Sequence, residues 1–212
     1  MLITHVGHSE FLITLENGFR IVTDPFDSEC GYPIRDITAD AVLVSHHHHD
    51  HDAVNLVKGH PQIIDCTGKH TLAQDIKVTA IRAPHDDENG KKRGFTLLFL
   101  LEAENIRLVH LGDIGCNLSS EYIMSLAPAD ILMVPVGGFY TIDAAQAKIA
   151  SEALKARLII PMHYRTKYNH DWPIATVDRF ISLYPGIDIE NKAQALRITS
   201  CDIDLQPKIA VL

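Results

Sequence analysis

The 212-residue sequence has only four cysteines, and no two of them form a Cys-x-x-Cys pair. A disulfide framework is therefore poorly supported, and ordinary thiols in a reducing compartment are expected. The longest apolar run, residues 95–101, is too short to span a bilayer. Residues 1–10 have neither the basic region nor the long apolar core of a signal peptide. We therefore expect a cytoplasmic protein without a membrane span.

Positive charge is also in short supply, with 19 Lys and Arg against 27 Asp and Glu, for a formal net charge of -8. This balance argues against a broad electrostatic grip on nucleic acid, so no nucleic-acid partner is expected. It does not exclude a small phosphate-bearing substrate, because bound cations would dominate the local field. Neither a linker nor a low-complexity segment interrupts the chain, and its length predicts one domain over residues 1–212.

What the sequence has in abundance is histidine and aspartate within one stretch, Ser-His-His-His-His-Asp-His-Asp at residues 45–52. The apolar run at 40–44 predicts a buried strand before it, and residues 53–58 predict a helix after it. Asp50 and His51 lie where this turn would enter the helix. Imidazole and carboxylate groups are ligands of divalent metals, zinc above all. The stretch therefore predicts a metal-binding turn.

Alternation along the turn divides its histidines into two sets. In an extended segment, His46 and His48 point to one side, and His47 and His49 point to the other. We expect the first pair to bind metal and the second pair to point away from the site. An expression tag is excluded, because the run lies deep inside the chain.

Other polar residues follow predicted strands at a distance from the turn. Asp24 ends a strand at 19–22, which returns from a hairpin turn at Asn17-Gly18. Three further strands, at 77–82, 105–111 and 158–164, lead to or end on polar residues. These residues are His85, Asp113 and His163. His8, between the strands at 2–6 and 11–15, can reach the cleft or lie in a solvated loop, and the sequence leaves this open.

The remaining pattern completes the expected elements. Strands are predicted at 62–66, 94–101 and 130–136, with two or three more within 187–212; helices are predicted at 119–127, 142–157 and 173–184, with one helical turn at 71–75. The polar segment 86–93 predicts a mobile loop whose basic residues, Lys91 to Arg93, are either solvated or attract an anionic substrate. Tyr140 and Tyr164 can contact substrate, with packing preferred for Tyr164.

At this point the sequence resembles a known family. The motif His-x-His-x-Asp-His after a buried strand is similar to the signature of the metallo-β-lactamase-fold hydrolases, and the separate Asp and His positions follow in the family's order. Within the family, the Gly7-His8-Ser9 loop resembles that of a small uncharacterised branch related to ascorbate-phosphate lactonases and phospholipase-D-like enzymes. The His-Glu-Ala-Thr motif of the family's tRNA-processing ribonucleases is absent.

The resemblance implies a single-domain α/β fold, a four-layer αββα sandwich with a metal cleft along one edge. It also implies two divalent metal ions. The first would be held by His46, His48 and His85, the second by Asp50, His51 and His163, with Asp113 bridging them. Zinc is favoured, while Mn²⁺, Fe²⁺ and Ni²⁺ stay open. Asp24 would orient the turn by hydrogen bonding, and His8 and Tyr140 are the candidate substrate contacts.

The implied activity is hydrolysis, with Asp50 and Asp113 at the family's catalytic positions. A hydroxide shared by two cations would attack a small ester, lactone or phosphodiester, phosphorylated or not. No nucleophile-elbow motif offers a serine instead. The alternative is a non-catalytic metal-binding sensor or scaffold of the same fold. The partner expected is a small-molecule substrate, and the sequence does not specify an oligomeric state.

Overall fold

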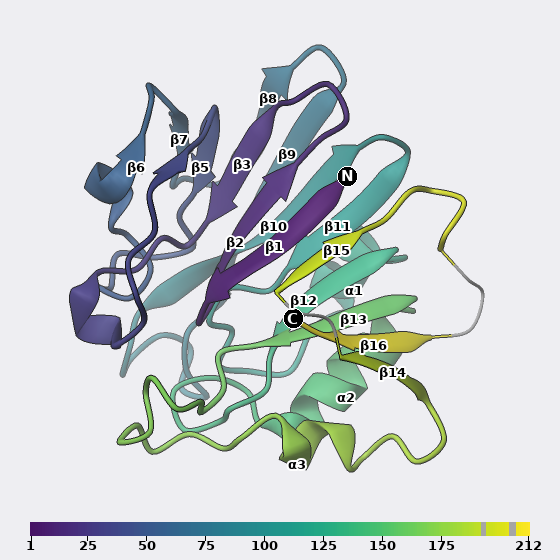
Figure 1. The fold of residues 1–212 in the computed structure, drawn as a ribbon. Coiled ribbons are helices and arrows are strands. Elements are labelled where there is room, and N and C mark those ends of the chain that lie inside the picture. Colours follow the sequence, from purple (N-terminus) through teal and green to yellow (C-terminus); the bar gives the residue numbers. More distant parts are fainter. Residues whose placement is uncertain (192–193, 204–206) are drawn as a thin grey trace.

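The computed structural model describes residues 1–191, 194–203 and 207–212, in which two β-sheets pack face to face (Figure 1). The first sheet has the order β15 (Ala195–Arg197), β1 (Leu2–Gly7), β2 (Glu10–Thr14), β3 (Arg20–Thr23), β5 (Ala41–Leu43) and β7 (Gln62–Ile64). The second has the order β14 (Asp188–Asn191), β16 (Lys208–Val211), β13 (Leu158–Met162), β12 (Ile131–Pro135), β11 (Ile106–His110), β10 (Phe95–Ala103), β9 (Ile76–Pro84) and β8 (Gly68–Ala73).

Alternate residues of the strands fill the space between the two sheets. Ile3, Phe11 and Ile13 of the first sheet and Phe99 and Leu101 of the second belong to one buried apolar cluster. Each such side chain stabilises the fold by roughly 1.5–3 kcal/mol when it is withdrawn from water. The polar candidate residues of the site therefore lie at the ends of the strands, outside this apolar core.

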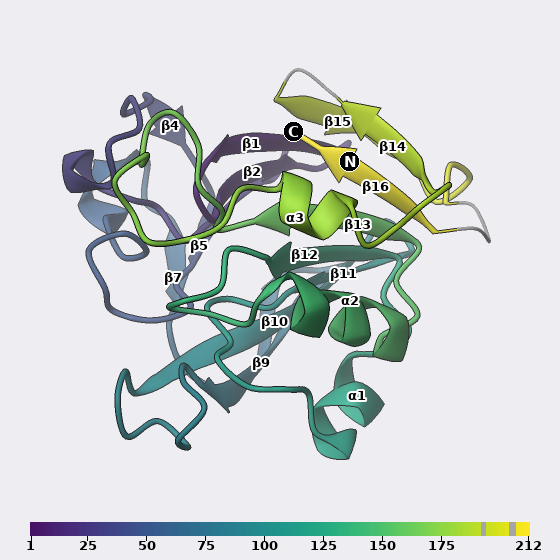
Figure 2. The same cartoon turned by 90° about the horizontal axis from the view of Figure 1, so that it is seen from below.

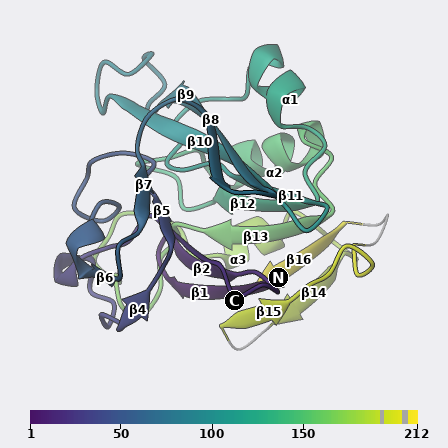
Figure 3. The ribbon, with the colours of Figure 1, turned by 90° about the horizontal axis from the view of Figure 1, so that it is seen from above.

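The helices all cover one side of the sandwich in the described part of the chain. They are α1 (Ser120–Leu126), α2 (Ala144–Ala153) and α3 (Asp178–Ile181). Leu126 and Phe180 pack with the outer face of the second sheet, and α1 and α2 lie on the side of that sheet opposite to β1 and β2 (Figure 2 and Figure 3). The predicted sandwich fold is thus confirmed.

The other outer layer differs from the simple αββα expectation. The first sheet is covered by two short 3₁₀ helices, η1 (Ser28–Cys30) and η2 (Val54–Leu56), and by the small sheet of β4 (Ile37–Thr38) and β6 (Val57–Lys58). Apolar side chains of this segment, Phe26 and Ile37 among them, pack against Val22 and Val42 of the sheet. This layer seals the sheet without an α-helix among the described residues.

The directions of the strands explain where the site lies. In the first sheet β1 and β3 are both antiparallel to β2, and β5 is parallel to β3. In the second sheet β9 and β11 are both antiparallel to β10, and β12 and β13 run parallel to β11. The carboxyl ends of equally directed strands meet at one edge of each sheet, which is where ligand sites form in layered α/β folds.

Two predicted helical segments before β9 are wrong. Residues 53–58 form η2 and β6, because β6 pairs in parallel with β4 and Ala53 provides no side-chain cap. Residues 71–75 lie mostly in β8, which pairs antiparallel with β9. Short apolar segments of five or six residues are compatible with either structure, and pairing with a neighbouring strand decides between them.

The helix predicted at 173–184 is also largely wrong, because only α3 forms there. The backbone N–H of Ala175 donates to the Gly137 carbonyl at 2.8 Å, and the Ala175 carbonyl accepts from the Arg165 N–H at 2.8 Å. These bonds hold the first part of the segment against neighbouring loops. The helices at 119–127 and 142–157 are confirmed with shorter bounds, and Ser119 and Asp143 cap them.

Each helix that the structure describes is too short or too polar to cross a lipid bilayer. The closing strands predicted within 187–212 are confirmed as β14, β15 and β16, although residues 192–193 and 204–206 of that range lie outside the described residues.

Glu10 gives the fold a testable pH dependence. Its side chain is buried, with one carboxylate oxygen 3.4 Å from the Phe26 N–H, and burial raises the pKa of this carboxyl from 4.5 to about 8. The unfolded chain releases this proton at a lower pH than the folded chain, so the stability contributed by protonated Glu10 is fully present below pH 4.5 and is lost as the pH rises toward about 8.

Glu10→Gln should remove that dependence, whose slope is at most about 1.4 kcal/mol per pH unit. The measurement is urea unfolding of equally metal-loaded proteins between pH 5 and 8. Glu16→Gln changes an exposed glutamate and is the control. Parallel pH profiles for the wild type and Glu10→Gln would contradict the expectation.

Candidate metal centre

Asp24 anchors the histidine-rich turn from the end of β3. It is fully buried, and its two carboxylate oxygens accept hydrogen bonds from the Ser45 N–H at 2.7 Å and the Ser45 hydroxyl at 2.8 Å. The Ser45 hydroxyl also lies 2.9 Å from His46 Nδ1, and Asp24 Oδ2 lies 3.0 Å from His51 Nδ1. One carboxylate therefore orients two imidazoles, leaving the Nε2 atom of each for another partner.

Three imidazoles form the first group at the edge. Nitrogen atoms of His46, His48 and His85 lie within 4.8 Å of one another. The His46 ring centroid is 4.5 Å from that of His48 and 4.7 Å from that of His85. His48 is exposed, but it lines the cleft, so its exposure is toward the space in which a substrate would lie.

A second group combines a carboxylate with three imidazoles. Ligand atoms of His8, Asp50, His51 and His163 lie within 4.8 Å of one another. Asp50 Oδ2 is 3.5 Å from His51 Nε2 and 3.2 Å from His8 Nε2. The sequence left His8 open, and the structure buries it in this group, with its ring 4.2 Å from that of His163.

Asp113 lies between the two groups. Its Oδ2 atom is 3.0 Å from His163 Nε2, 3.4 Å from His51 Nε2 and 3.7 Å from His85 Nε2. One carboxylate oxygen thus faces imidazoles of both groups. The structure brings together all seven of the ligands that the sequence predicted, with Asp24 beside them.

Electrostatics within the cluster separate neutral from charged groups. Burial lowers the pKa of His46 to about 2, and burial together with the nearby His163 lowers the pKa of His8 to about 4. Burial opposes ionisation of Asp113, yet His163 and His51 hold the pKa of its carboxyl well below its usual range. The carboxylates of Asp113, Asp50 and Asp24 act in the opposite direction on His51 and raise the pKa of this imidazole well above its usual value, although burial opposes the shift. His46 and His8 are therefore held neutral beside ionised carboxylates, whereas a cation bound at His51 would have to replace a proton.

The unpaired atoms of the cluster are consistent with cations. His46 Nε2 and Asp113 Oδ1 are buried and have no hydrogen-bond partner among the described residues. Leaving such groups unpaired typically costs about 1–3 kcal/mol each. The donor set, imidazole nitrogens with carboxylate oxygens, is typical of zinc and other borderline divalent metals. The residues present therefore fit divalent metal ions.

Residues 2–163 match the family model described as a beta-lactamase superfamily domain. A UPF0173 metal-dependent hydrolase from Carboxydothermus hydrogenoformans is 33% identical, with 84% of this chain and 88% of the relative covered. A second, from Archaeoglobus fulgidus, is 31% identical over 78% and 84% of the two chains. This chain belongs to the metallo-β-lactamase superfamily, among the UPF0173 metal-dependent hydrolases.

A solved structure supports the same assignment. A protein from Thermotoga maritima, described as a candidate Zn-dependent hydrolase of the metallo-β-lactamase superfamily, is 36% identical and superposes with a TM-score of 0.83 over 99% of this chain and 97% of its own. The predictions of the fold and of a metal-dependent hydrolase are thus confirmed at the level of the family.

At this edge of the metallo-β-lactamase fold, several residues have unusual backbone conformations. His8, Asp24 and His163 adopt left-handed conformations, with φ of 53°, 39° and 51°. Such conformations cost non-glycine residues of order 1–3 kcal/mol each and persist where surrounding structure enforces them. Gly112, at φ 49°, is required beside Asp113, because a Cβ atom there would lie 2.5 Å from Thr96 Oγ1 and 2.6 Å from the Leu97 carbonyl oxygen.

His47 and His49 differ from their neighbours in the turn. Their side chains are 65% and 51% exposed, and their nitrogens approach Asp52 and Asp27 at 3.4 and 3.5 Å. Neither belongs to the two groups that meet at Asp113. The alternation therefore separates these two histidines from the two ligand groups, but both still line the cleft beside His48.

A cavity of about 720 Å³ opens over the two candidate ligand groups and forms the cleft. Tyr140, a predicted substrate contact, lines it, whereas Tyr164 is buried in the core. Sequence reasoning missed Trp172, whose ring lies 5.1 Å from that of His8. It left open whether the basic residues at 91–93 are solvated or attract an anionic substrate, and the structure places Arg93 in the lining of the cleft. The one available signal was that Trp172 is the only tryptophan of the chain.

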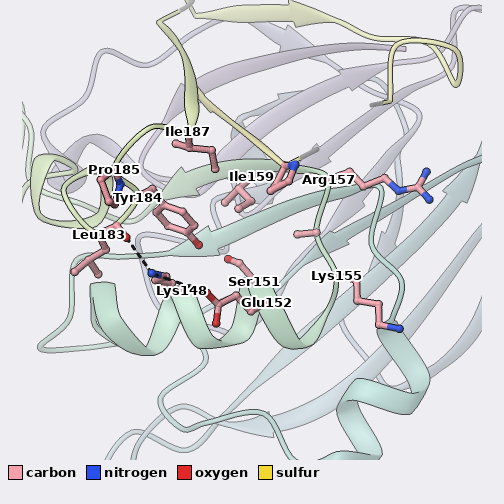
Figure 4. Close-up of a pocket in the computed structure, with 12 residues that line it drawn as sticks. Lys148, Ser151, Glu152, Lys155, Arg157, Ile159, Leu183, Tyr184, Pro185 and Ile187 are labelled. Atoms are coloured by element: carbon pink, nitrogen blue, oxygen red, sulfur yellow. Dashed lines mark hydrogen bonds and ion pairs between the residues drawn. The ribbon is translucent and has the colours of Figure 1, made fainter. Parts of the chain in front are cut away.

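A second cavity of similar size, about 690 Å³, lies between α2 and residues 183–187 (Figure 4). Two of its basic side chains have partners: Lys148 Nζ donates to the Leu183 carbonyl at 3.0 Å, and Arg157 lies 3.6 Å from Asp130. The Tyr184 hydroxyl points toward Ser151 across it. Size therefore does not single out the functional cavity, and the ligand cluster does.

Proposed function

We propose that this chain hydrolyses small esters, lactones or phosphodiesters, phosphorylated or not, with two divalent cations, most favourably Zn²⁺. The assignment is supported by Asp113, whose single oxygen faces imidazoles of both ligand groups at 3.0–3.7 Å. A carboxylate in that position offsets the mutual repulsion of two closely spaced cations, which a neutral side chain cannot do. The first cation would be held by His46, His48 and His85, and the second by Asp50, His51 and His163.

The cations would supply a hydroxide nucleophile at neutral pH and withdraw charge from the attacked carbonyl or phosphoryl group. The protein's own residues prepare the site for this. Asp24 fixes the turn through Ser45 and orients His51. His8 lies beside Asp50 within the second group, with its Nε2 atom 3.2 Å from Asp50 Oδ2. Burial of these groups excludes bulk water and strengthens each electrostatic contact.

The size and charge of the chain support a small substrate. A cavity of about 720 Å³ is in the range of small-molecule sites. The net charge of -8 opposes binding to nucleic acid. A non-catalytic sensor of the same fold would keep the ligands and show no turnover, so activity measurements separate the two functions.

Metal content is the first test of the binuclear assignment. Protein purified without chelator, or reconstituted with Zn²⁺ and desalted, should carry about two metal ions per chain by elemental analysis. A maximum of one after reconstitution would contradict a binuclear site. The same preparations should hydrolyse at least one member of an ester, lactone and phosphodiester panel, and chelation should abolish this activity. Full metal loading without turnover on any member would favour the sensor.

A further inference from the structure

The loop after His85 is held in place by one carboxylate. Asp86 Oδ1 accepts from the N–H groups of Glu88 and Gly90, and Asp86 Oδ2 accepts from those of Lys92 and Arg93, each at 2.8 Å. The sequence predicted a mobile loop here, and the structure instead gives an ordered one closed by four hydrogen bonds. Because Asp86 follows a metal ligand directly, the backbone of Arg93 is positioned relative to the metal edge.

The three cations of this loop have different surroundings. Lys92 Nζ pairs with Glu88 at 2.7 Å and with Asp87 at 3.1 Å, and Lys91 is exposed. Arg93 is half-buried, lines the cleft beside the ligands, and has its guanidinium carbon 5.6 Å from the centre of the Tyr140 ring. Among the described residues, no carboxylate oxygen lies within 4.0 Å of the Arg93 nitrogens.

We propose that Arg93 binds an anionic group of the substrate, a phosphate or a carboxylate, and thereby selects the substrate class. The role of Arg93 in selecting substrates rests on the proposed hydrolase function. A half-buried guanidinium without a counterion gains most from an oxyanion, which its planar fork binds through two parallel hydrogen bonds. Tyr140 and Trp172 flank the cleft and provide apolar surface for the rest of the molecule. The substrate is thus a small anion carrying a hydrolysable ester, lactone or phosphodiester bond.

Trp172 allows the proposal to be tested without turnover. It is the chain's only tryptophan and it lines the cleft, so its fluorescence reports what the cleft binds. The zinc-loaded protein is titrated with three probes that share one ring: phenylphosphonate, benzoate and neutral benzamide. Both anions should bind more tightly than benzamide, and the difference between phosphonate and benzoate tells whether phosphate or carboxylate is preferred.

The decisive comparison is between Arg93→Gln and Lys91→Gln. Arg93→Gln should weaken binding of the preferred anion by about tenfold or more and leave benzamide unchanged. Lys91→Gln removes the same charge from the loop surface and should change neither by more than about twofold. Arg93→Lys keeps the charge without the fork and should fall between them. Equal anion binding by wild type and Arg93→Gln, or equal weakening of benzamide, would overturn the proposal.

A kinetic pair links this result to hydrolysis. For 4-acetoxybenzoate and its neutral methyl ester, Arg93→Gln should raise KM for the charged ester alone and change kcat little. If wild type cleaves neither ester nor any other panel member, the proposed function fails, while the fluorescence titration still decides whether Arg93 binds anions. If both esters are cleaved and Arg93→Gln affects them alike, the inference about Arg93 fails and the hydrolase assignment stands.

Discussion

Replacing Asp113 by alanine is expected to abolish hydrolysis and to lower the affinity of both metal sites. Its Oδ2 atom is the one carboxylate oxygen within 4.0 Å of imidazole nitrogens from both groups among the described residues. The loss in activity should exceed the roughly 10–100-fold typical of residues that only orient ligands. Elemental analysis and turnover of the same preparation are the measurements.

Two conservative variants sharpen this prediction. Asp113→Asn keeps the shape and removes the charge, so it should be nearly as damaging as the alanine variant. Asp24→Asn changes a buried residue that orients His51 and Ser45, and it should cost about 10–100-fold in metal affinity or activity, with partial recovery at excess metal. An Asp113→Asn enzyme with two metals and normal turnover would refute the bridging role.

The second large effect is expected within the histidine run itself. His46→Ala should lose the metal of the first group, and most of the activity, because Ser45 orients this imidazole and its Nε2 has no other partner among the described residues. His48→Ala should act on the same metal. Metal content should fall from about two ions per chain to about one.

The neighbouring histidines provide matched controls for this experiment. His47→Ala and His49→Ala remove exposed imidazoles that approach carboxylates outside the two groups. Metal content should therefore stay near the wild-type value, and stability should change by less than about 0.5 kcal/mol. Loss of metal from His47→Ala comparable to that from His46→Ala would mean that the alternation assigns the wrong histidines.

The histidine-rich turn could be predicted as metal-binding from the sequence alone, because imidazole and carboxylate groups are side chains that bind divalent metals. His85, Asp113 and His163 were predicted as ligands only through the resemblance to the metallo-β-lactamase-fold hydrolases, since a single polar residue after a strand does not by itself indicate a metal ligand. The location of His8 could not be predicted, because a single histidine in a loop has no regular spacing to other histidines. Its burial depends on packing against His163 from the other sheet, which is a non-local contact.

The elements that could not be predicted depend on distant partners. β6 and β8 are strands because β4 and β9 lie beside them, and residues 173–177 are not helical because Gly137 and Arg165 hold their backbone. Arg93 reaches the cleft because Asp86 folds its loop, a set of four bonds that composition does not disclose. The local sequence pattern indicates which chemical role a residue can take, but it does not predict which distant residues will lie beside it.

The ligands are divided between the two sheets, and this has a consequence for folding. Each group takes two residues from the turn after β5 and at least one from the second sheet, His85 or His163. The two sheets also join at this edge, where the Leu97 N–H donates to the Ser45 carbonyl at 2.8 Å and the His163 N–H to the His8 carbonyl at 3.2 Å. A nascent chain in which only β1 to β7 have formed would have incomplete sites and would hold metal weakly. We therefore expect tight metal uptake only after the two sheets have docked, and the bound ions would stabilise the docked state.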